Sequence, residues 1–476
     1  MFMRCPLLRL VSFFLVLSFV LVVFSEAIRD KTSFFADYYD IPKNSVDVIF
    51  VGSSHVYSGY IPAVLWKEYG ISSYNIFAWS MPMWTAYYYT KEALKTQSPQ
   101  VVLFDISSLW YGYGEDPHQI DNIDFVNNQG FGFGINRYEY LLSNLSVGTT
   151  SRTLGEINDI SRYHNGWRYN YKTTPPKKTD YSFLRNYGGL YTQLDSELLN
   201  MTFYQDVLEP RPDVKQYLSK LVTLSKENGF DLVFILTPCD MTKESAFIVN
   251  WTNEYCLEHN IPFLNFLDST KYDFDLMRDM ADVDHLNSKG AFKATRYAGD
   301  YLCANYSFRP PKTNPDYEQI SKDAAAVYEM FDLNDNVIHA SSSATALDWI
   351  RNSNSLDVIV FVQNSSLLSD VQKDFLKDMG IPMYEYPFVA EVNKGICRYT
   401  KKLNSATEID VPDLSLKAEL QQNALCLKLD DLEINRSHAP MSVFLYDYAM
   451  NRSTVIINID KNDLEVHEIV HLLRGT

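Results

Sequence analysis

The segment Val48-Ile-Phe-Val-Gly-Ser-Ser-His55 decides the predicted fold, because an apolar run passes directly into a turn of small residues. Residues 48–51 predict a buried strand, and Gly52 permits the chain to leave that strand in a tight turn. A serine that follows such a turn, here Ser54, presents its hydroxyl at the carboxyl edge of a sheet. We therefore expect a polar site at the end of this strand.

A second segment, Asp282-Val-Asp-His-Leu-Asn-Ser-Lys-Gly290, carries an aspartate and a histidine three residues apart. Asp282 and His285 can face the same crevice from one turn. The carboxylate would then accept a hydrogen bond from His285 Nδ1, and Nε2 would be left to take a proton from a serine. Asp284 lies between the two and is expected to be a solvated or helix-capping carboxylate.

Short apolar runs alternate with amphipathic stretches from residue 46 onward. Strands are predicted at 46–51, 74–77, 101–105, 232–236 and 263–266, and helices at 62–69, 84–96, 214–227, 243–258 and 288–303. Strands separated by helices indicate a parallel sheet with helices on both faces, an α/β domain of flavodoxin-like type. The two polar segments occupy the first and last strand–helix connections of this domain.

The pattern divides the chain into four parts. Residues 1–30 form a leader, 31–308 the main α/β domain, 309–318 a proline-rich linker, and 319–476 a smaller accessory α/β domain. Within the main domain, 107–211 is an insertion rich in Tyr and Asn. It is expected either to overhang the crevice as a lid or to be a structural excursion that buries its tyrosines locally.

The leader predicts the compartment of the protein. Arg4 and Arg9 precede an uncharged apolar run at 10–25, and 25–27 has the small-x-small form of a cleavage site. We expect an uncleaved single-pass anchor in the cell membrane or a removed signal peptide, with the body of the protein outside the cytoplasm in both cases.

Composition excludes several classes of protein. The 476 residues include 42 Lys+Arg against 59 Asp+Glu, and the net charge of −17 argues against a nucleic-acid partner. The six cysteines contain no C-x-x-C pair, which excludes a disulfide scaffold and a zinc ribbon. The segment His467-Glu-Ile-Val-His471 matches a zinc-binding pattern, but only five residues follow it. We predict a terminal amphipathic helix there, with no metal and no cofactor.

The two polar segments resemble the first and last blocks of the SGNH/GDSL hydrolase superfamily. The Ser54-His55 ending, residues 99–105 and the Asp282-x-x-His285 block are most similar to its extracytoplasmic, membrane-anchored branch, which includes teichoic-acid D-alanylation and alginate O-acetylation proteins. The resemblance covers about residues 45–305. It implies that Ser54 is the nucleophile, His285 the general base and Asp282 the residue that orients it. It also implies that the Ser54 backbone N–H is one donor to the oxyanion.

The middle blocks of the superfamily are altered in this chain. Its usual glycine and asparagine oxyanion donors have no counterpart, so Ala78, Ser80 and Ser107 are the candidate replacements. Ser53 replaces the usual aspartate of the first block and is expected to tune the structure. The remaining candidates near the site are three residues expected to line the substrate or support its loops: His55, Trp79 and Asp105.

The resemblance implies a serine esterase or O-acyltransferase, acting most naturally with acetyl groups. The expected partner is an acylated cell-surface or secreted polysaccharide, and a membrane protein that supplies the acyl group is a further expected partner. The alternative is a catalytically degenerate protein of the same fold that binds or assembles glycans. The accessory domain faintly resembles a domain shared by interleukin-like inducers and a glycosyltransferase stem, which implies sugar binding; a scaffold or docking role remains open.

Overall fold

The structure is a computed structural model that describes residues 6–28, 37–110, 131, 134–146, 182–189, 205–333, 337 and 340, and most of 342–468. Within that last range, 353–356, 394–395, 405–406, 412–413, 422–423, 430–431, 448–451 and 461–462 lie outside the description. The chain divides into two compact units, Met1–Val327 and Tyr328–Thr476.

The first unit is built on the predicted parallel sheet. Its five strands are β1 (Val48–Gly52), β2 (Ser73–Phe77), β3 (Val101–Asp105), β4 (Asp231–Leu236) and β5 (Phe263–Asn265). They lie in the order β2-β1-β3-β4-β5, and every neighbouring pair is parallel. This is the flavodoxin-like order, which places all carboxyl ends at one edge. The predicted fold class is confirmed.

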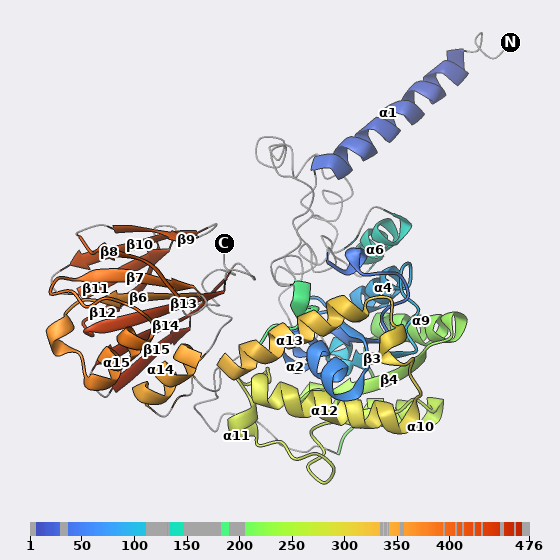
Figure 1. Ribbon diagram of the computed structural model, residues 1–476. Helices are drawn as coiled ribbons and strands as arrows, with labels where there is room; N and C mark the ends of the chain where they lie inside the picture. The colour runs from blue at the N-terminus through green and yellow to red at the C-terminus, as the bar shows by residue number, and fades with distance from the viewer. Residues whose placement is uncertain are drawn as a thin grey trace. The chain divides into compact units, whose positions relative to one another are not determined.

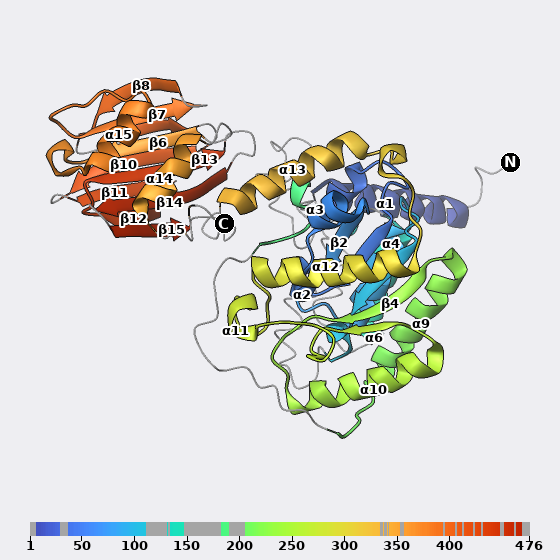
Figure 2. The ribbon, with the colours of Figure 1, turned by 60° about the horizontal axis from the view of Figure 1, so that its bottom comes forward.

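Helices cover both faces of this sheet (Figures 1 and 2). Alternate residues of β1 face opposite layers: Ile49 packs with α4, α9 and α10, whereas Phe50 packs with α2 and α12. The elements are α2 (Ser54–Gly59), α3 (Pro62–Val64), a π-helical turn (Leu65–Tyr69), α4 (Met83–Ala93), a 3-10 turn η4 (Ile106–Leu109), α6 (Ile135–Ser146), α9 (Pro212–Asn228), α10 (Lys243–His259), α11 (Leu276–Asp279), α12 (Ser288–Asn305) and α13 (Tyr317–Leu333).

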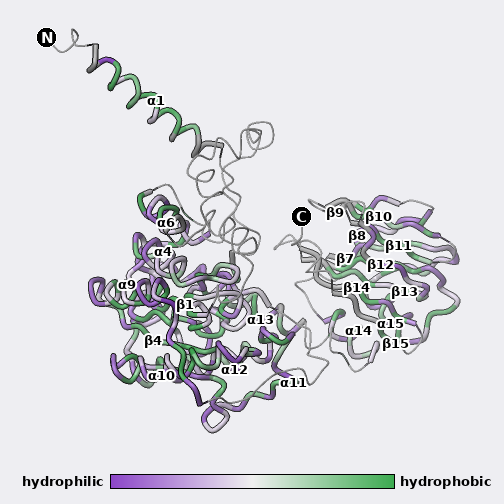
Figure 3. Tube along the Cα trace, turned by 180° about the vertical axis from the view of Figure 1, so that it is seen from behind, coloured by the Kyte–Doolittle hydropathy of each residue, from purple (hydrophilic) through white to green (hydrophobic). Residues whose placement is uncertain are grey.

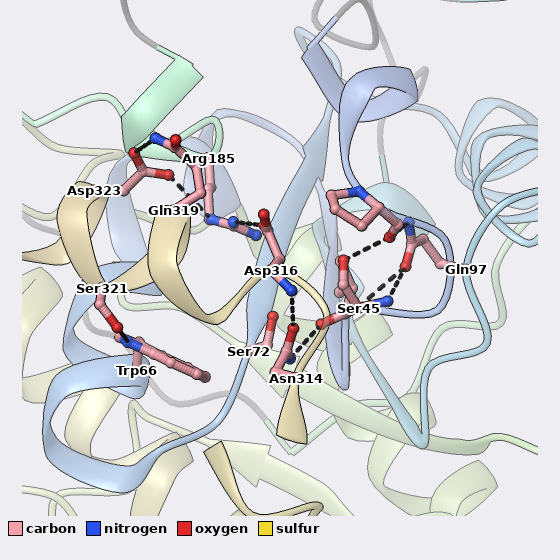
Figure 4. Close-up of polar contacts among 12 residues, drawn as sticks. Ser45, Trp66, Ser72, Gln97, Arg185, Asn314, Asp316, Gln319, Ser321 and Asp323 are labelled. Carbon is pink, nitrogen blue, oxygen red and sulfur yellow. Dashed lines mark hydrogen bonds and ion pairs between the residues drawn. The ribbon is translucent and has the colours of Figure 1, made fainter. Parts of the chain in front are cut away.

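The predicted linker at 309–318 belongs to the first unit, which corrects the expected domain boundary. Asn314 donates its side-chain N–H to the Ser45 carbonyl at 2.8 Å, and Arg185 forms a buried ion pair with Asp316 (Figure 4). These contacts fasten the chain to the first unit before α13 begins. The boundary therefore falls within α13, between Val327 and Tyr328.

The second unit contains two antiparallel sheets. A six-stranded sheet has the order β15-β14-β13-β6-β7-β8, and a four-stranded sheet has the order β12-β11-β10-β9. Ile359 and Phe361 pack toward the four-stranded sheet, whereas Val358 and Val360 pack toward α14 and α15. The unit is thus a sandwich with helices on one outer face.

Most strands of the second unit were not expected. The helices are α14 (Ser343–Asn352) and α15 (Asp370–Asp378). The strands are β6 (Asp357–Val362), β7 (Phe388–Asn393), β8 (Ile396–Lys402), β9 (Thr407–Val411), β10 (Leu414–Gln421), β11 (Ala424–Leu429), β12 (Leu432–Ser437), β13 (Met441–Asp447), β14 (Arg452–Asp460) and β15 (Asp463–Glu468).

The terminal helix predicted around the H-E-x-x-H segment is wrong. His467 and Glu468 lie in β15, where they pair with Ile456 and Val455 of β14, and His471 lies outside the described residues. The zinc-binding form of this motif requires both histidines on one face of a helix. Because His467 and Glu468 lie in a strand, this segment does not form the zinc-binding motif.

The leader contains the 23-residue helix α1 (Pro6–Ile28), whose described turns are largely apolar (Figure 3). Nowhere in the described residues does the structure contain a helix with the length and apolar character that crossing a membrane requires, so the expected transmembrane helix is not found. Much of the predicted 107–211 insertion, 111–130 and 147–181 above all, lies outside the described residues.

Candidate active site

Ser54 is placed by the tight exit from β1 that its sequence predicted. A side chain at Gly52 would put its Cβ 2.6 Å from the Asp105 Cβ, so only glycine lets β1 end this close to the end of β3. Ser53 then begins α2 as its N-cap, and its side chain accepts a hydrogen bond from the His55 backbone N–H at 3.3 Å. Ser54 is the first residue of α2 and remains partly exposed.

The loop that carries Asp282 and His285 is fastened at its base. Met280 and Leu286 form an antiparallel bridge, which closes the loop into a tight turn. Asn287 caps α12 by accepting from two backbone N–H groups, and its amide donates to the Met280 carbonyl at 3.2 Å. A Cβ at position 290 would lie 2.2 Å from the Asp279 carbonyl oxygen, which explains why the segment ends in glycine.

The structure brings Ser54, His285 and Asp282 into one hydrogen-bonded line. His285 Nε2 lies 2.8 Å from Ser54 Oγ, and His285 Nδ1 lies 2.9 and 3.0 Å from the two Asp282 carboxylate oxygens. An ionised carboxylate can only accept, so Nδ1 carries the proton and Nε2 accepts from the serine hydroxyl. This is the arrangement of nucleophile, base and orienting carboxylate that acyl transfer through a serine requires.

Asp282 is kept ionised by the groups around it. Burial opposes its charge, but hydrogen bonds from the His285 ring and from the backbone N–H groups of Asp284 and His285 outweigh burial and lower the pKa of the Asp282 carboxyl. The Asp282 side chain is 55% exposed and that of His285 is 25% exposed. The line therefore reaches solvent at its Asp282 end.

Asp105 ends β3 next to this line and is entirely buried. Its carboxylate accepts from the Ser107 backbone N–H at 2.9 Å and from the Thr237 hydroxyl at 2.8 Å. His55 Nδ1 lies 3.8 Å from Asp105 Oδ1, an ion-pair distance that is too long for a hydrogen bond. Burial raises the pKa of Asp105, but the His55 and Ser107 interactions outweigh it and the pKa is lowered.

Burial corrects the predicted substrate-lining role of Asp105. Asp105 has no exposed surface, so it cannot line a substrate site, and His55 is only 4% exposed. The physical reason is that Ser107 of η4, Thr237 after β4 and His55 of α2 surround the Asp105 carboxylate. Trp79, in contrast, is 40% exposed just beyond the end of β2.

Two predicted oxyanion donors are already engaged. The Ala78 N–H donates to the Gly52 carbonyl at 3.3 Å, which extends the pairing of β1 and β2. The Ser107 N–H is held by Asp105, and its hydroxyl lies 3.1 Å from the Ser53 hydroxyl. Ser80, the third predicted donor, lies two residues after Ala78 and has a left-handed backbone conformation, with φ of 41°.

Thr237 and Tyr60 are polar residues of the site that the sequence did not single out. Thr237 follows β4, and its hydroxyl donates its proton to Asp105. The Thr237 Oγ1 atom can therefore only accept from the Tyr60 hydroxyl, which lies 3.0 Å away and donates to it. The available signal was a polar residue directly after a buried strand, because the carboxyl ends of β3 and β4 are adjacent. Within the described residues, no three His, Cys, Asp or Glu side chains are grouped to hold a metal ion.

An aromatic cluster adjoins the serine on the β2 side. Tyr57 lies three residues after Ser54 on α2, so both occupy one face of that helix. The Tyr57 ring packs against Phe77, with ring centres 4.4 Å apart, and against Trp79 at 5.7 Å. This cluster, Tyr57 with Phe77 and Trp79, is called the aromatic shelf, and it begins one helical turn after Ser54.

Comparisons with known proteins give low similarities. No family model matches the chain, and no curated protein matches it. A solved structure assigned to the G-D-S-L family of lipolytic proteins, from Desulfitobacterium hafniense, is 13% identical with a TM-score of 0.28, over 54% of this chain and 98% of the other. An acetyl xylan esterase from the rumen bacterium Butyrivibrio proteoclasticus is 10% identical with a TM-score of 0.23, over 56% of this chain and 65% of the other. Similarities this low assign the chain to no family, and the argument for its activity rests on the geometry of the site.

Proposed function

We propose that this protein is a serine esterase or O-acyltransferase of SGNH type, in which Ser54 carries the acyl group. The observation that supports this most directly is the unbroken line from Ser54 Oγ through both ring nitrogens of His285 to Asp282. Two segments 231 residues apart in sequence meet there at hydrogen-bond distance. An orienting carboxylate with a lowered pKa completes the set of roles.

The proposed reaction follows from which atoms carry protons. Ser54 Oγ attacks the ester carbonyl while its proton passes to His285 Nε2, and the carbonyl oxygen becomes an oxyanion. Collapse breaks the bond to the leaving alcohol, which receives the proton from Nε2, and leaves an acyl-serine. Water or a second hydroxyl then gives its proton to Nε2 and attacks the acyl-serine, which regenerates Ser54 and releases an acid or a new ester.

We propose an O-acyl glycan, with acetyl as the acyl group, as the substrate class. The aromatic shelf supports this proposal, because Trp79 is exposed and packs against Tyr57 of the helix that carries Ser54, so it offers an apolar surface on which a sugar ring can pack. The extracytoplasmic location, the acyl-donor membrane protein and the sugar-binding role of the second unit remain predictions from the sequence.

A second candidate function is favoured by the engaged donors. Since the Ala78 and Ser107 N–H groups already have acceptors, the site offers an oxyanion fewer backbone donors than expected. Loss of one such donor costs about a hundred- to a thousandfold in rate. A protein that binds glycans without turnover is therefore the alternative.

Labelling with a fluorophosphonate separates these candidates without knowledge of the substrate. We expect the full-length protein to form an adduct on Ser54, located by peptide mass mapping, and Ser54→Ala and His285→Ala to abolish it. Ser58→Ala is the matched control, because Ser58 lies one turn later on α2 and bonds only the Ser54 carbonyl in the described structure. A folded wild-type protein that forms no adduct would overturn the enzyme and favour the binding protein.

A further inference from the structure

A second histidine–aspartate pair lies next to Ser54 and is not used by the proposed mechanism. His55 directly follows Ser54, and its Nδ1 lies 3.8 Å from Asp105 Oδ1. The side chains are 5% and 0% exposed, and Nδ1 is buried without a hydrogen-bond partner. The His55 ring meets the His285 ring edge to face, with centres 5.9 Å apart. Two imidazoles therefore lie against each other close to Ser54.

The surroundings of Asp105 place His55 next to a buried carboxylate. Asp105 is fixed by the Ser107 N–H and the Thr237 hydroxyl, and both are neutral donors. A buried carboxylate is costly unless a positive group lies near it. Among the side chains that contact Asp105 in the described structure, His55 is the one that can carry positive charge. The lowered pKa of Asp105 agrees with this pairing.

Two of the predicted donors to the oxyanion are engaged elsewhere in the described structure. Once the Ala78 and Ser107 N–H groups are engaged, the N-terminus of α2 contributes the Ser54 N–H as the donor adjacent to the nucleophile. Efficient acyl transfer uses two or more donors aimed at the developing charge. The end of β3, where His55 meets Asp105, is adjacent to β1 and its serine turn.

We propose that His55 supplies a further donor: Asp105 holds its Nδ1 edge, and the Nε2–H on the far edge of the ring donates to the oxyanion formed at Ser54. This inference rests on the proposed function. His55 acts as a hydrogen-bond donor in this proposal, whereas His285 takes one proton and returns it. Asp105 is a positioning residue, because it acts through His55 and does not reach the acyl group.

The test compares two replacements of His55 in the full-length protein with p-nitrophenyl acetate as substrate. His55→Phe keeps a ring against His285 but removes the donor, and we expect kcat to fall about a hundred- to a thousandfold with KM within threefold. His55→Gln retains a side-chain N–H and is expected to keep at least a tenth of the wild-type kcat. Thermal unfolding of each variant reports whether the fold is retained.

The affinity for a trifluoromethyl ketone is a second measurement, which a purely structural role of His55 would leave unchanged. The hemiketal of this ketone with Ser54 carries an oxyanion, so the affinity should fall in His55→Phe by the same factor as kcat/KM. Wild-type-like kcat in His55→Phe overturns the inference, as does an equal loss in the Gln and Phe variants at unchanged thermal stability. If wild type forms no fluorophosphonate adduct, the proposed function fails and this inference fails with it. An adduct on wild type together with an unaffected His55→Phe variant removes this inference alone.

Discussion

The two histidine–aspartate pairs beside Ser54 have the same chemistry in opposite environments. The pair of His285 and Asp282 stands in a surface loop and is partly exposed, whereas the pair of His55 and Asp105 is enclosed at the end of β3. His285 touches the serine hydroxyl directly at 2.8 Å, and His55 touches the other ring from the side. Solvent access lets the first pair exchange protons during turnover, while burial suits the second to a fixed position.

The two carboxylates are also held by different means. Asp282 accepts from backbone N–H groups of its own loop, at 2.8 Å from Asp284 and 2.9 Å from His285, so its position is set locally. Asp105 is held by Ser107 and by Thr237 from a neighbouring strand, so its position is set by the sheet. Replacement of Asp282 should therefore affect chemistry, and replacement of Asp105 should also affect folding.

The largest expected effect is on catalysis, in Asp282→Asn. The amide would offer an N–H or an oxygen to His285 Nδ1 without a charge, and the wrong tautomer of His285 would point a proton at Ser54. We expect kcat to fall by about 10⁴-fold, the scale seen when the orienting aspartate of a serine triad becomes asparagine. The free energy of unfolding should change by less than about 1 kcal/mol, because Asp282 is largely exposed. Esterase rates and urea unfolding measure the two quantities, and a loss of several kcal/mol would contradict the contrast drawn between the pairs.

Asp105→Asn should affect stability more than Asp282→Asn does, and its loss of unfolding free energy should depend on pH. The two Asp105 oxygens accept separately from the Ser107 N–H and the Thr237 hydroxyl, and an asparagine has only one acceptor oxygen. We therefore expect the free energy of unfolding to be lower by about 1–3 kcal/mol at pH 7. Because the pKa of Asp105 is lower in the folded protein, its stabilisation is complete above the ordinary pKa of about 3.9 and declines as the pH falls below it.

The measurement is the difference in unfolding free energy between wild type and Asp105→Asn from pH 7 to pH 3. It should stay constant down to about pH 5 and shrink below pH 4. A difference that grows on acidification would mean that Asp105 is protonated in the folded protein, which removes the carboxylate proposed to hold the Nδ1 edge of His55. Asp282→Asn is the matched control at the exposed pair.

The sequence was sufficient for those parts of the site that short segments specify. The apolar run into Gly52 predicted β1 and the exposed serine, and the three-residue spacing of Asp282 and His285 predicted that they would face each other. The parallel sheet with helices on both faces followed from the alternation of apolar runs, whereas the strand order comes from the structure. Local patterning carried these predictions because each depends on residues within one turn or one strand.

Contacts between segments that are distant in the sequence could not be predicted from local patterns. The burial of Asp105 depends on Thr237, which lies 132 residues away on the adjacent strand. The linker prediction failed because the ion pair between Arg185 and Asp316 joins segments with no shared pattern. A helix was predicted at His467 because the apolar spacing of this segment fits both a helix and a strand. Pairing with β14 makes it a strand.

The smallest expected effect is that of Ser53→Ala, which tests whether the two pairs are linked through the start of α2. Ser53 caps the helix that carries Ser54, and its hydroxyl also lies 3.1 Å from that of Ser107, whose N–H holds Asp105. Removal of an N-cap costs about 1 kcal/mol, and the buried Ser107 hydroxyl would lose a partner as well. We expect unfolding to require about 1–2 kcal/mol less and kcat to fall by less than tenfold, because the bond between Ser54 and His285 does not involve Ser53. Ser58→Ala is the control on the same helix. A hundredfold loss of kcat would show that the buried network directly sets the position of the nucleophile, and the exposed pair could then no longer be treated as independent of the buried one.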